Sequence, residues 1–248
     1  DKWEVLSLSA IDDDGNALWP SDYPIARLEQ IKGVLPSRDW NSLYQQDPIP
    51  DEGEYFKTEW FLEYDTLPDD LEFYGASDYA VTDGDGDYTE HGIFGIDRAG
   101  NLYLADWWFG KSTSDVWIDA KCDLIIKHKP DCWFGESGVI RRSIEPFLAR
   151  RMNERNAICR IEWLASVAGK ESRARGFQGM ASMGKIFIPK NAIWKDHVMS
   201  QLIRFPAGKH DDAVDVCSLI GRGLEHINAK RAKYVAPKKA YVQHGWMG

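Results

Sequence analysis

An apolar stretch that ends in one carboxylate is the feature that most constrains how this chain folds. Residues 71–80 read Leu-Glu-Phe-Tyr-Gly-Ala-Ser-Asp-Tyr-Ala, and these aromatic and small side chains suit a strand packed inside a sheet. The carboxylate is Asp78, at the far end of the strand. A buried Asp without a partner is strongly destabilising, so such a residue is usually hydrogen-bonded, paired with a cation or bound to a metal. A strand-end Asp that caps the next turn is the alternative for this residue alone.

Two later stretches also place acidic residues beside apolar core sequence. Glu136 follows Trp-Phe-Gly, and the run His210-Asp211-Asp212-Ala-Val-Asp215 opens an apolar helical pattern. Taken singly, Glu136 could interact with a helix dipole and the paired aspartates could cap the last helix. The repeated pattern favours a common site.

The hydrophobic periodicity predicts an α/β chain after about residue 58. Three successive antiparallel strands are followed by helix, strand, helix, strand and helix, which describes a mixed sheet with helices on both faces. This order matches the ribonuclease H-like fold. The predicted strands are 71–80, 89–96, 102–109, 131–135 and 157–164, the short segment 186–189 follows them, and the predicted helices are about 112–128, 137–155, 192–203 and 211–227.

That fold would bring the distant acids together. Its first and fourth strands are neighbours, so Asp78 and Glu136 would meet near one sheet edge, and the last helix would add Asp211, Asp212 and Asp215. Converging carboxylates repel one another and persist only if cations lie between them. Oxygen ligands without Cys favour two Mg²⁺ or Mn²⁺ ions over zinc, and such a pair can hydrolyse a phosphodiester.

Composition is compatible with this site but does not prove it. The 248 residues are 44% hydrophobic, enough for a sizeable core, and the net charge of −9 hides an uneven distribution. Residues 1–120 carry −20, residues 121–200 carry +7 and residues 201–248 carry +4. A DNA-binding face built from later elements would have this pattern, and solvated helix faces are the alternative.

The cysteines and the hydropathy indicate a globular protein of a reducing compartment. Cys122, Cys132, Cys159 and Cys217 lie far apart without a Cys-x-x-Cys pair, so we expect reduced, mostly buried thiols. No run of 18 apolar residues and no signal peptide pattern is present, and we expect no membrane association.

These motifs together resemble the nuclease domain of the large terminase subunit of tailed bacteriophages. The three acidic motifs are those around Asp78, Glu136 and residues 210–215. In addition, residues 40–48 (Trp-Asn-Ser-Leu-Tyr-Gln-Gln-Asp-Pro) and 52–56 are similar to the junction between packaging ATPase and nuclease. The resemblance implies a Mg²⁺- or Mn²⁺-dependent endonuclease that cuts concatemeric viral double-stranded DNA, with Asp78, Glu136 and Asp212 as metal ligands, Asp211 as alternate and Asp215 as auxiliary.

The same resemblance implies an organisation and partners. Residues 1–55 would be the end of an ATPase domain or linker segment that packs on the nuclease, 56–228 the ribonuclease H-like nuclease domain, and 229–248 a basic, flexible C-terminal tail. The partners would be the portal protein, the small terminase subunit and a preceding packaging ATPase domain, in the host cytoplasm, with the isolated domain a monomer. The predicted DNA-binding side chains are Lys170, Arg173, Arg175, Lys185, Arg141 and Arg142.

Two further stretches of the sequence approximate known motifs. Residues 179–185 only approximate a Walker A loop, since Ile186 follows where Ser or Thr would hold Mg²⁺, so we expect no ATPase activity from this chain. The acidic loop of residues 83–87 departs from an EF-hand, because Tyr88 and Phe94 replace its Gly and Glu, although Asp83 or Asp85 could still reach a metal. A Holliday-junction resolvase and a non-catalytic docking module remain alternative functions.

Overall fold

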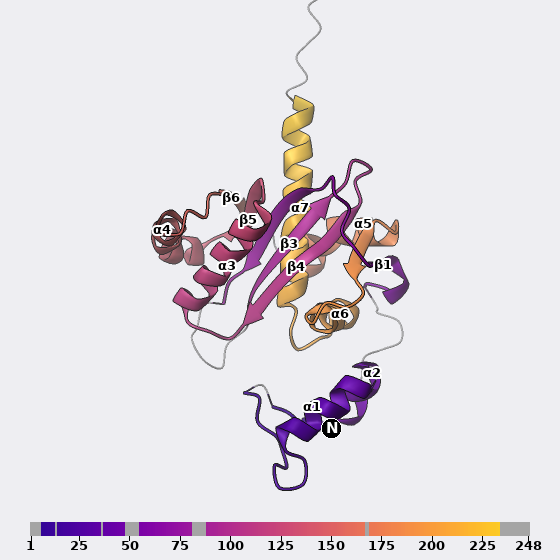
Figure 1. Ribbon diagram of the computed structural model, residues 1–248. Helices are drawn as coiled ribbons and strands as arrows, with labels where there is room; N and C mark the ends of the chain where they lie inside the picture. Colours follow the sequence, from indigo (N-terminus) through magenta and orange to yellow (C-terminus); the bar gives the residue numbers. More distant parts are fainter. Residues whose placement is uncertain are drawn as a thin grey trace, which may run out of the picture.

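A mixed sheet with helices on both faces forms the body of the protein (Figure 1). The computed structural model describes residues 6–12, 14–35, 37–47, 55–80, 88–166 and 169–233. The acidic loop of residues 83–87 and the tail beyond residue 233 therefore lie outside the described residues.

The sheet has seven strands in the order β1-β7-β4-β3-β2-β5-β6. The pair β2–β3 is antiparallel and so is β3–β4, whereas β5 and β6 continue the sheet in parallel from β2. This arrangement confirms the predicted ribonuclease H-like topology. The strands are β1 (Phe61–Tyr64), β2 (Glu72–Asp78), β3 (Thr89–Ile96), β4 (Leu102–Gly110), β5 (Cys132–Ser137), β6 (Arg160–Ala165) and β7 (Ile186–Pro189).

The helices divide between the two faces of the sheet. Helices α3 and α4 cover one face, while α7 crosses the other face next to α5 (Figure 1). The helices are α1 (Ile25–Val34), α2 (Ser37–Leu43), η1 (Thr58–Trp60), α3 (Ser114–His128), α4 (Val139–Glu154), α5 (Lys170–Ser182), α6 (Lys195–Arg204) and α7 (Asp212–Lys233). None of the helices in the described part of the chain is long and apolar enough to cross a membrane.

Large aromatic side chains need glycine on the strands they cover. A Cβ placed on Gly75 of β2 would lie 2.3 Å from a ring carbon of the fully buried Trp133, and one on Gly135 of β5 would lie 2.8 Å from Trp163. Both strands therefore carry glycine where an indole packs against the backbone. The four cysteines are free; Cys122, Cys132 and Cys217 are buried and Cys159 is partly buried, as predicted.

The main difference from the sequence prediction lies between residues 165 and 185. The Gly, Ser and Arg content of this stretch gave no predicted helix, yet residues 170–182 form α5. Ala174, Phe177 and Ala181 are fully buried on one side of it, because α5 packs against α7. Tertiary packing therefore overrides a weak local preference.

The N-terminal segment, meaning the described residues between 6 and 47, buries two large apolar side chains. Leu28 and Trp40 are buried, and Trp40 stacks on Tyr44 at 4.9 Å. The side-chain amide of Gln45 accepts from the backbone N–H of Ile11 and donates to its carbonyl. Arg204 of α6 pairs with Asp47, which ties the end of this segment to the body.

Candidate active site

One end of the sheet brings the predicted acidic residues together. On β2, Asp78 pairs across to Glu90 of β3, while Ser77 pairs with Gly135 of β5, so Glu136 is one residue beyond the last β2–β5 pair. Helix α7 begins at Asp212 and contacts β2, β3 and β5. Parallel neighbours β2 and β5 thus end at the same edge, as the topology predicted.

The electrostatics of Asp78 show that these acids share one environment. Burial raises the pKa of the Asp78 carboxyl well above its usual range, and the negative charges of Asp215, Asp212, Glu90 and Glu136 raise it further. Four acids from three other elements therefore act on one carboxylate. A cation at this place would lower their mutual repulsion.

Two observations bear on whether a divalent cation fits these residues. Oε1 of Glu136 is buried and has no hydrogen-bond partner among the described residues, which suits an oxygen that binds a cation. No group of three or more His, Cys, Asp or Glu side chains is, however, already arranged around a common point within the described ranges. The donor set is hard oxygen and matches Mg²⁺ or Mn²⁺, but the side chains would have to close on the ion.

Two side chains of α5 already neutralise part of the acidic cluster. Nζ of Lys170 lies 2.6 Å from Oδ1 of Asp211, and a guanidinium nitrogen of Arg173 lies 2.8 Å from Oδ1 of Asp215. Burial still raises the pKa of Asp215, although Arg173 opposes the shift. These predicted DNA-binding cations therefore lie beside the acids.

Glu90 is a buried acid that the sequence analysis did not select. It is fully buried on β3 and accepts hydrogen bonds from Nε1 of Trp107 at 2.7 Å and Nε2 of Gln201 at 2.9 Å. Nε2 of His197 lies 2.7 Å from Oε1 of the same carboxylate. An acid inside the predicted strand 89–96 was the available signal. These partners fix Glu90, so we assign it no metal-binding role.

Aromatic rings lie beside this end of the sheet. His197 stacks on Phe109 with ring centroids 3.7 Å apart, and the ring of Tyr88 contacts both His197 and His210. Lys111 lies over the Tyr88 ring at 5.0 Å. The residue before the paired aspartates is thus held in an aromatic cluster.

A buried polar network supports β2 from the opposite face. Oγ of Ser77 accepts from Nε1 of Trp133 and lies 2.8 Å from Nδ1 of His91. Nζ of Lys121 donates to the Tyr79 hydroxyl at 2.7 Å and lies over the Trp133 ring. Side chains alternate along a strand, so Ser77 and Tyr79 anchor the strand whose intervening side chain, Asp78, faces the acids.

The remaining predicted DNA-binding residues are dispersed. Arg175 is exposed on α5 and Arg142 is exposed on α4. Arg141 pairs with Glu145 at 3.0 Å and lies over Trp163. Lys185 precedes β7 near Gly100, at the end of the sheet away from Asp78, so the fold does not bring it to the acidic cluster.

Comparison with solved structures identifies proteins of the same fold. No family model matches the chain, and no curated protein matches it. The large terminase of a thermophilic bacteriophage aligns with a TM-score of 0.51 at 10% identity, covering 81% of this chain and 51% of that one. The human cytomegalovirus terminase nuclease domain aligns at 0.50 and 14% identity, covering 71% and 98%.

The chain has the fold of terminase nuclease domains. The large terminase nuclease of thermophilic phage G20c with bound magnesium aligns at a lower TM-score of 0.46, at 15% identity over 70% of this chain and 98% of that one. The alignment with the large terminase spans about half of that protein, so the remainder of the large terminase has no counterpart in the alignment.

Proposed function

We propose that this protein is the nuclease part of a viral packaging terminase, a metal-dependent endonuclease that cuts concatemeric double-stranded DNA. The observation that carries the proposal is that acidic residues from separate elements converge on Asp78 at one end of the sheet. Asp212, Asp215, Glu90 and Glu136 all act on Asp78 at one sheet end, in a fold that terminase nucleases share. Such repulsion destabilises the fold and is typical of functional sites.

Asp78, Glu136 and Asp212 would hold two Mg²⁺ or Mn²⁺ ions, with Asp211 as alternate and Asp215 as auxiliary ligand. Such ions, when bound, supply the positive charge that activates water and stabilises the leaving 3′ oxygen. The chain itself positions the reaction. Glu90, held by its three partners, fixes β3 beside Asp78, and the buried network under Ser77 fixes β2.

Double-stranded DNA would approach over α5 and the start of α7. Lys170, Arg173 and Arg175 lie on α5, and Arg142 with Arg141 lies on α4, where they could contact phosphates. Lys185 would contact DNA only at the far end of the sheet. In packaging, the partners would be the portal protein, the small terminase subunit and an ATPase domain, in the host cytoplasm, and the isolated chain would be a monomer.

The test is cleavage of supercoiled plasmid by the purified chain with Mn²⁺ or Mg²⁺. We expect nicking and linearisation that Asp78→Asn and Glu136→Gln each reduce at least about 100-fold, equivalent to roughly 2.7 kcal/mol. Asp131→Asn is the matched control, because Asp131 is exposed at the opposite end of β5 and should keep full activity.

Other results would point elsewhere. An unaltered, folded chain that leaves plasmid intact with both ions would favour a non-catalytic docking module. A strong preference for four-way junctions over linear duplex would favour a resolvase.

A further inference from the structure

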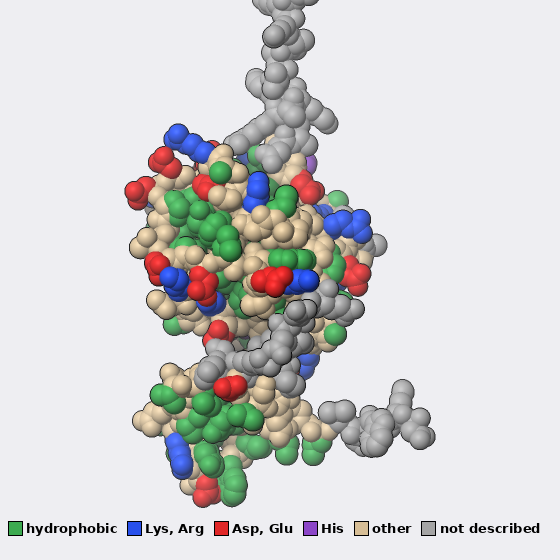
Figure 2. Space-filling view, turned by 90° about the vertical axis from the view of Figure 1, so that its right-hand side faces the viewer, with side chains coloured by type: hydrophobic (Ala, Val, Ile, Leu, Met, Phe, Trp, Pro, Cys, Tyr) green, Lys and Arg blue, Asp and Glu red, His purple; other side chains and the backbone are tan. Residues whose placement is uncertain are grey.

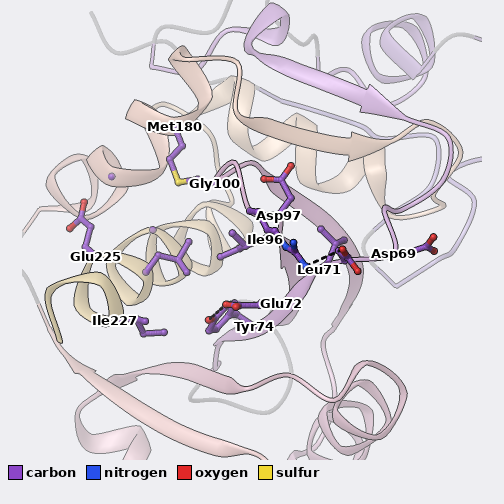
Figure 3. A pocket seen from close by; sticks show the side chains of 15 residues that line it. Asp69, Leu71, Glu72, Tyr74, Ile96, Asp97, Gly100, Met180, Glu225 and Ile227 are labelled. Atoms are coloured by element: carbon purple, nitrogen blue, oxygen red, sulfur yellow. Dashed lines mark hydrogen bonds and ion pairs between the residues drawn. The ribbon is translucent and has the colours of Figure 1, made fainter. Parts of the chain in front are cut away.

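A groove lies beside residues 221–227 of α7, away from the acidic cluster at the start of that helix. Figure 3 shows the side chains that line it. Its volume is about 740 Å³, and it is bounded by the start of β2, the β3–β4 turn, α5 and the C-terminal half of α7. Glu225 in its wall is ten residues after Asp215, which places it roughly 15 Å further along the helix. The groove is therefore separate from the proposed active site.

The floor of the groove is apolar. Leu71, Ile96, Met180 and Leu224 are each only partly buried there, beside the buried Ile227. Ile96, Met180 and Leu224 pack against the main core with one side and face the groove with the other. Apolar surface of this kind is removed from water when a partner covers it.

The rim of the groove is acidic. Five carboxylates line it, from three separate parts of the chain: Asp69, Asp70, Glu72, Asp97 and Glu225. Among the described residues of the lining, the one cation is Arg98, which pairs with Asp70 at 3.3 Å, and Lys185 approaches the groove near Gly100. This surplus of negative charge repels phosphates and anionic lipids and attracts a basic partner.

The geometry also limits how a peptide could bind. Strands β2 and β3 lie inside the sheet and pair on both sides, so neither offers a free edge to an added strand. An amphipathic helix that lays its apolar face in the groove needs no such edge. The charged rim would then meet the cations on the flanks of that helix.

We propose that this groove binds a basic amphipathic helix of a partner protein, with large apolar side chains on the floor and Lys or Arg side chains at the rim. This inference goes beyond the proposed nuclease function, and its test measures binding without any cleavage step. A failure here leaves the nuclease proposal untouched.

The test uses the full chain and three fluorescent peptides of about 18 residues, long enough for roughly 27 Å of helix. One peptide has a Leu and Trp face opposite a Lys and Arg face, the second has the same composition scrambled, and the third replaces the cations with Glu. Fluorescence anisotropy should show saturable binding of the first, with at least about tenfold weaker binding of the other two, a difference of roughly 1.4 kcal/mol.

Matched variants locate the binding. Asp69→Lys with Glu225→Lys should weaken binding at least about tenfold, while Glu29→Lys with Glu59→Lys, an equal charge change at exposed positions outside the groove, should change it less than about twofold. Met180→Gln on the floor should weaken binding, and Met183→Gln, exposed and outside the groove, should not. Absence of saturable binding, equal binding of the scrambled peptide, or equal losses from the two charge variants would overturn the proposal.

Discussion

Asp78 illustrates how a single buried charge can lower the stability of the fold. Its folded-state pKa is raised above the usual 3.8 by burial and by the neighbouring acids. The folded state therefore holds the proton more tightly than the unfolded chain does. The free energy of unfolding falls as pH rises from the unfolded pKa to the folded pKa, and above that window the charged carboxylate destabilises the fold.

Replacing that charge should stabilise the metal-free protein. We expect Asp78→Asn to raise Tm at pH 7–8 without divalent ions, by roughly 2–4 °C for each kcal/mol regained in a chain of this size. The gain should shrink toward pH 4, and Mn²⁺ should raise the Tm of the unaltered chain more than that of the variant. Thermal unfolding across pH measures this, with Asp131→Asn as control. A pH-independent gain would argue against charge repulsion as the cause.

Lys121, on the other face of the sheet, is a buried cation whose pKa is lowered, whereas the pKa of Asp78 is raised. It is fully buried, and burial lowers its pKa from 10.5 to about 7. Between these values the unfolded chain binds the proton more tightly, so stability rises with pH across this window. Lys121→Met should therefore stabilise the protein by about 1 kcal/mol or more at pH 6, with a smaller gain at pH 9. Urea unfolding at several pH values tests this, and parallel pH profiles would contradict it.

At the scale of elements, the contact between α5 and α7 decides which cations reach the acids. A Cβ on Gly221 of α7 would lie 2.9 Å from the backbone nitrogen of Phe177 on α5, so the two helices approach closely at this glycine. The close approach sets Lys170 against Asp211 and Arg173 against Asp215. A divalent ion that uses these aspartates has to compete with the two side chains.

Removing that competition should change metal and DNA binding in opposite directions. We expect Lys170→Gln with Arg173→Gln to increase Mn²⁺ affinity about three- to tenfold, because each of the two pairs is worth roughly 0.3–0.7 kcal/mol, and to weaken duplex binding with a shallower salt dependence. Calorimetry with Mn²⁺ alone and anisotropy with labelled duplex measure the two effects. Arg175→Gln, on the exposed side of α5, should weaken only DNA binding. If Mn²⁺ affinity stays unchanged or falls in the double variant, Mn²⁺ does not compete with Lys170 and Arg173 for Asp211 and Asp215.

At the scale of the whole molecule, the described residues of the N-terminal segment contribute no side chain to the buried core clusters of the body. Figure 2 shows hydrophobic side chains gathered on the lower lobe, and the exposed apolar residues of the segment include Leu6, Leu18, Trp19, Val34 and Leu43. Tyr55 marks where the chain joins the body. Its hydroxyl donates to the carbonyl of Glu171, and the next residue, Phe56, is fully buried in the main core.

A truncation series tests the predicted boundary near residue 55. A chain that starts at residue 55 should keep its Tm within about 3 °C and its plasmid cleavage, because the core residues of the body remain. A chain that starts at residue 58 loses Phe56 and should be destabilised by roughly 3–5 kcal/mol. If the longer of the two chains is also strongly destabilised, the boundary is wrong.

The local sequence pattern was sufficient to predict the strands and to select Asp78 and Glu136 as candidate site residues. The alternation and the apolar runs predicted β3 at its observed bounds and α3 to its last residue. Asp78 and Glu136 were identifiable because each interrupts an apolar run, and an acid in such a place requires compensation. These signals depend on residues close together in the sequence.

The tertiary structure alone decided which charges meet. Helix α5 has too little helical preference to be predicted, and it forms where Phe177 and Ala181 are buried next to α7. The pairing of Lys170 with Asp211, the role of Glu90 and the acidic groove each join residues distant in the chain. Hydrophobic periodicity records which side of an element is buried, whereas the partner of a charge depends on how the elements cross, and local sequence does not encode that crossing.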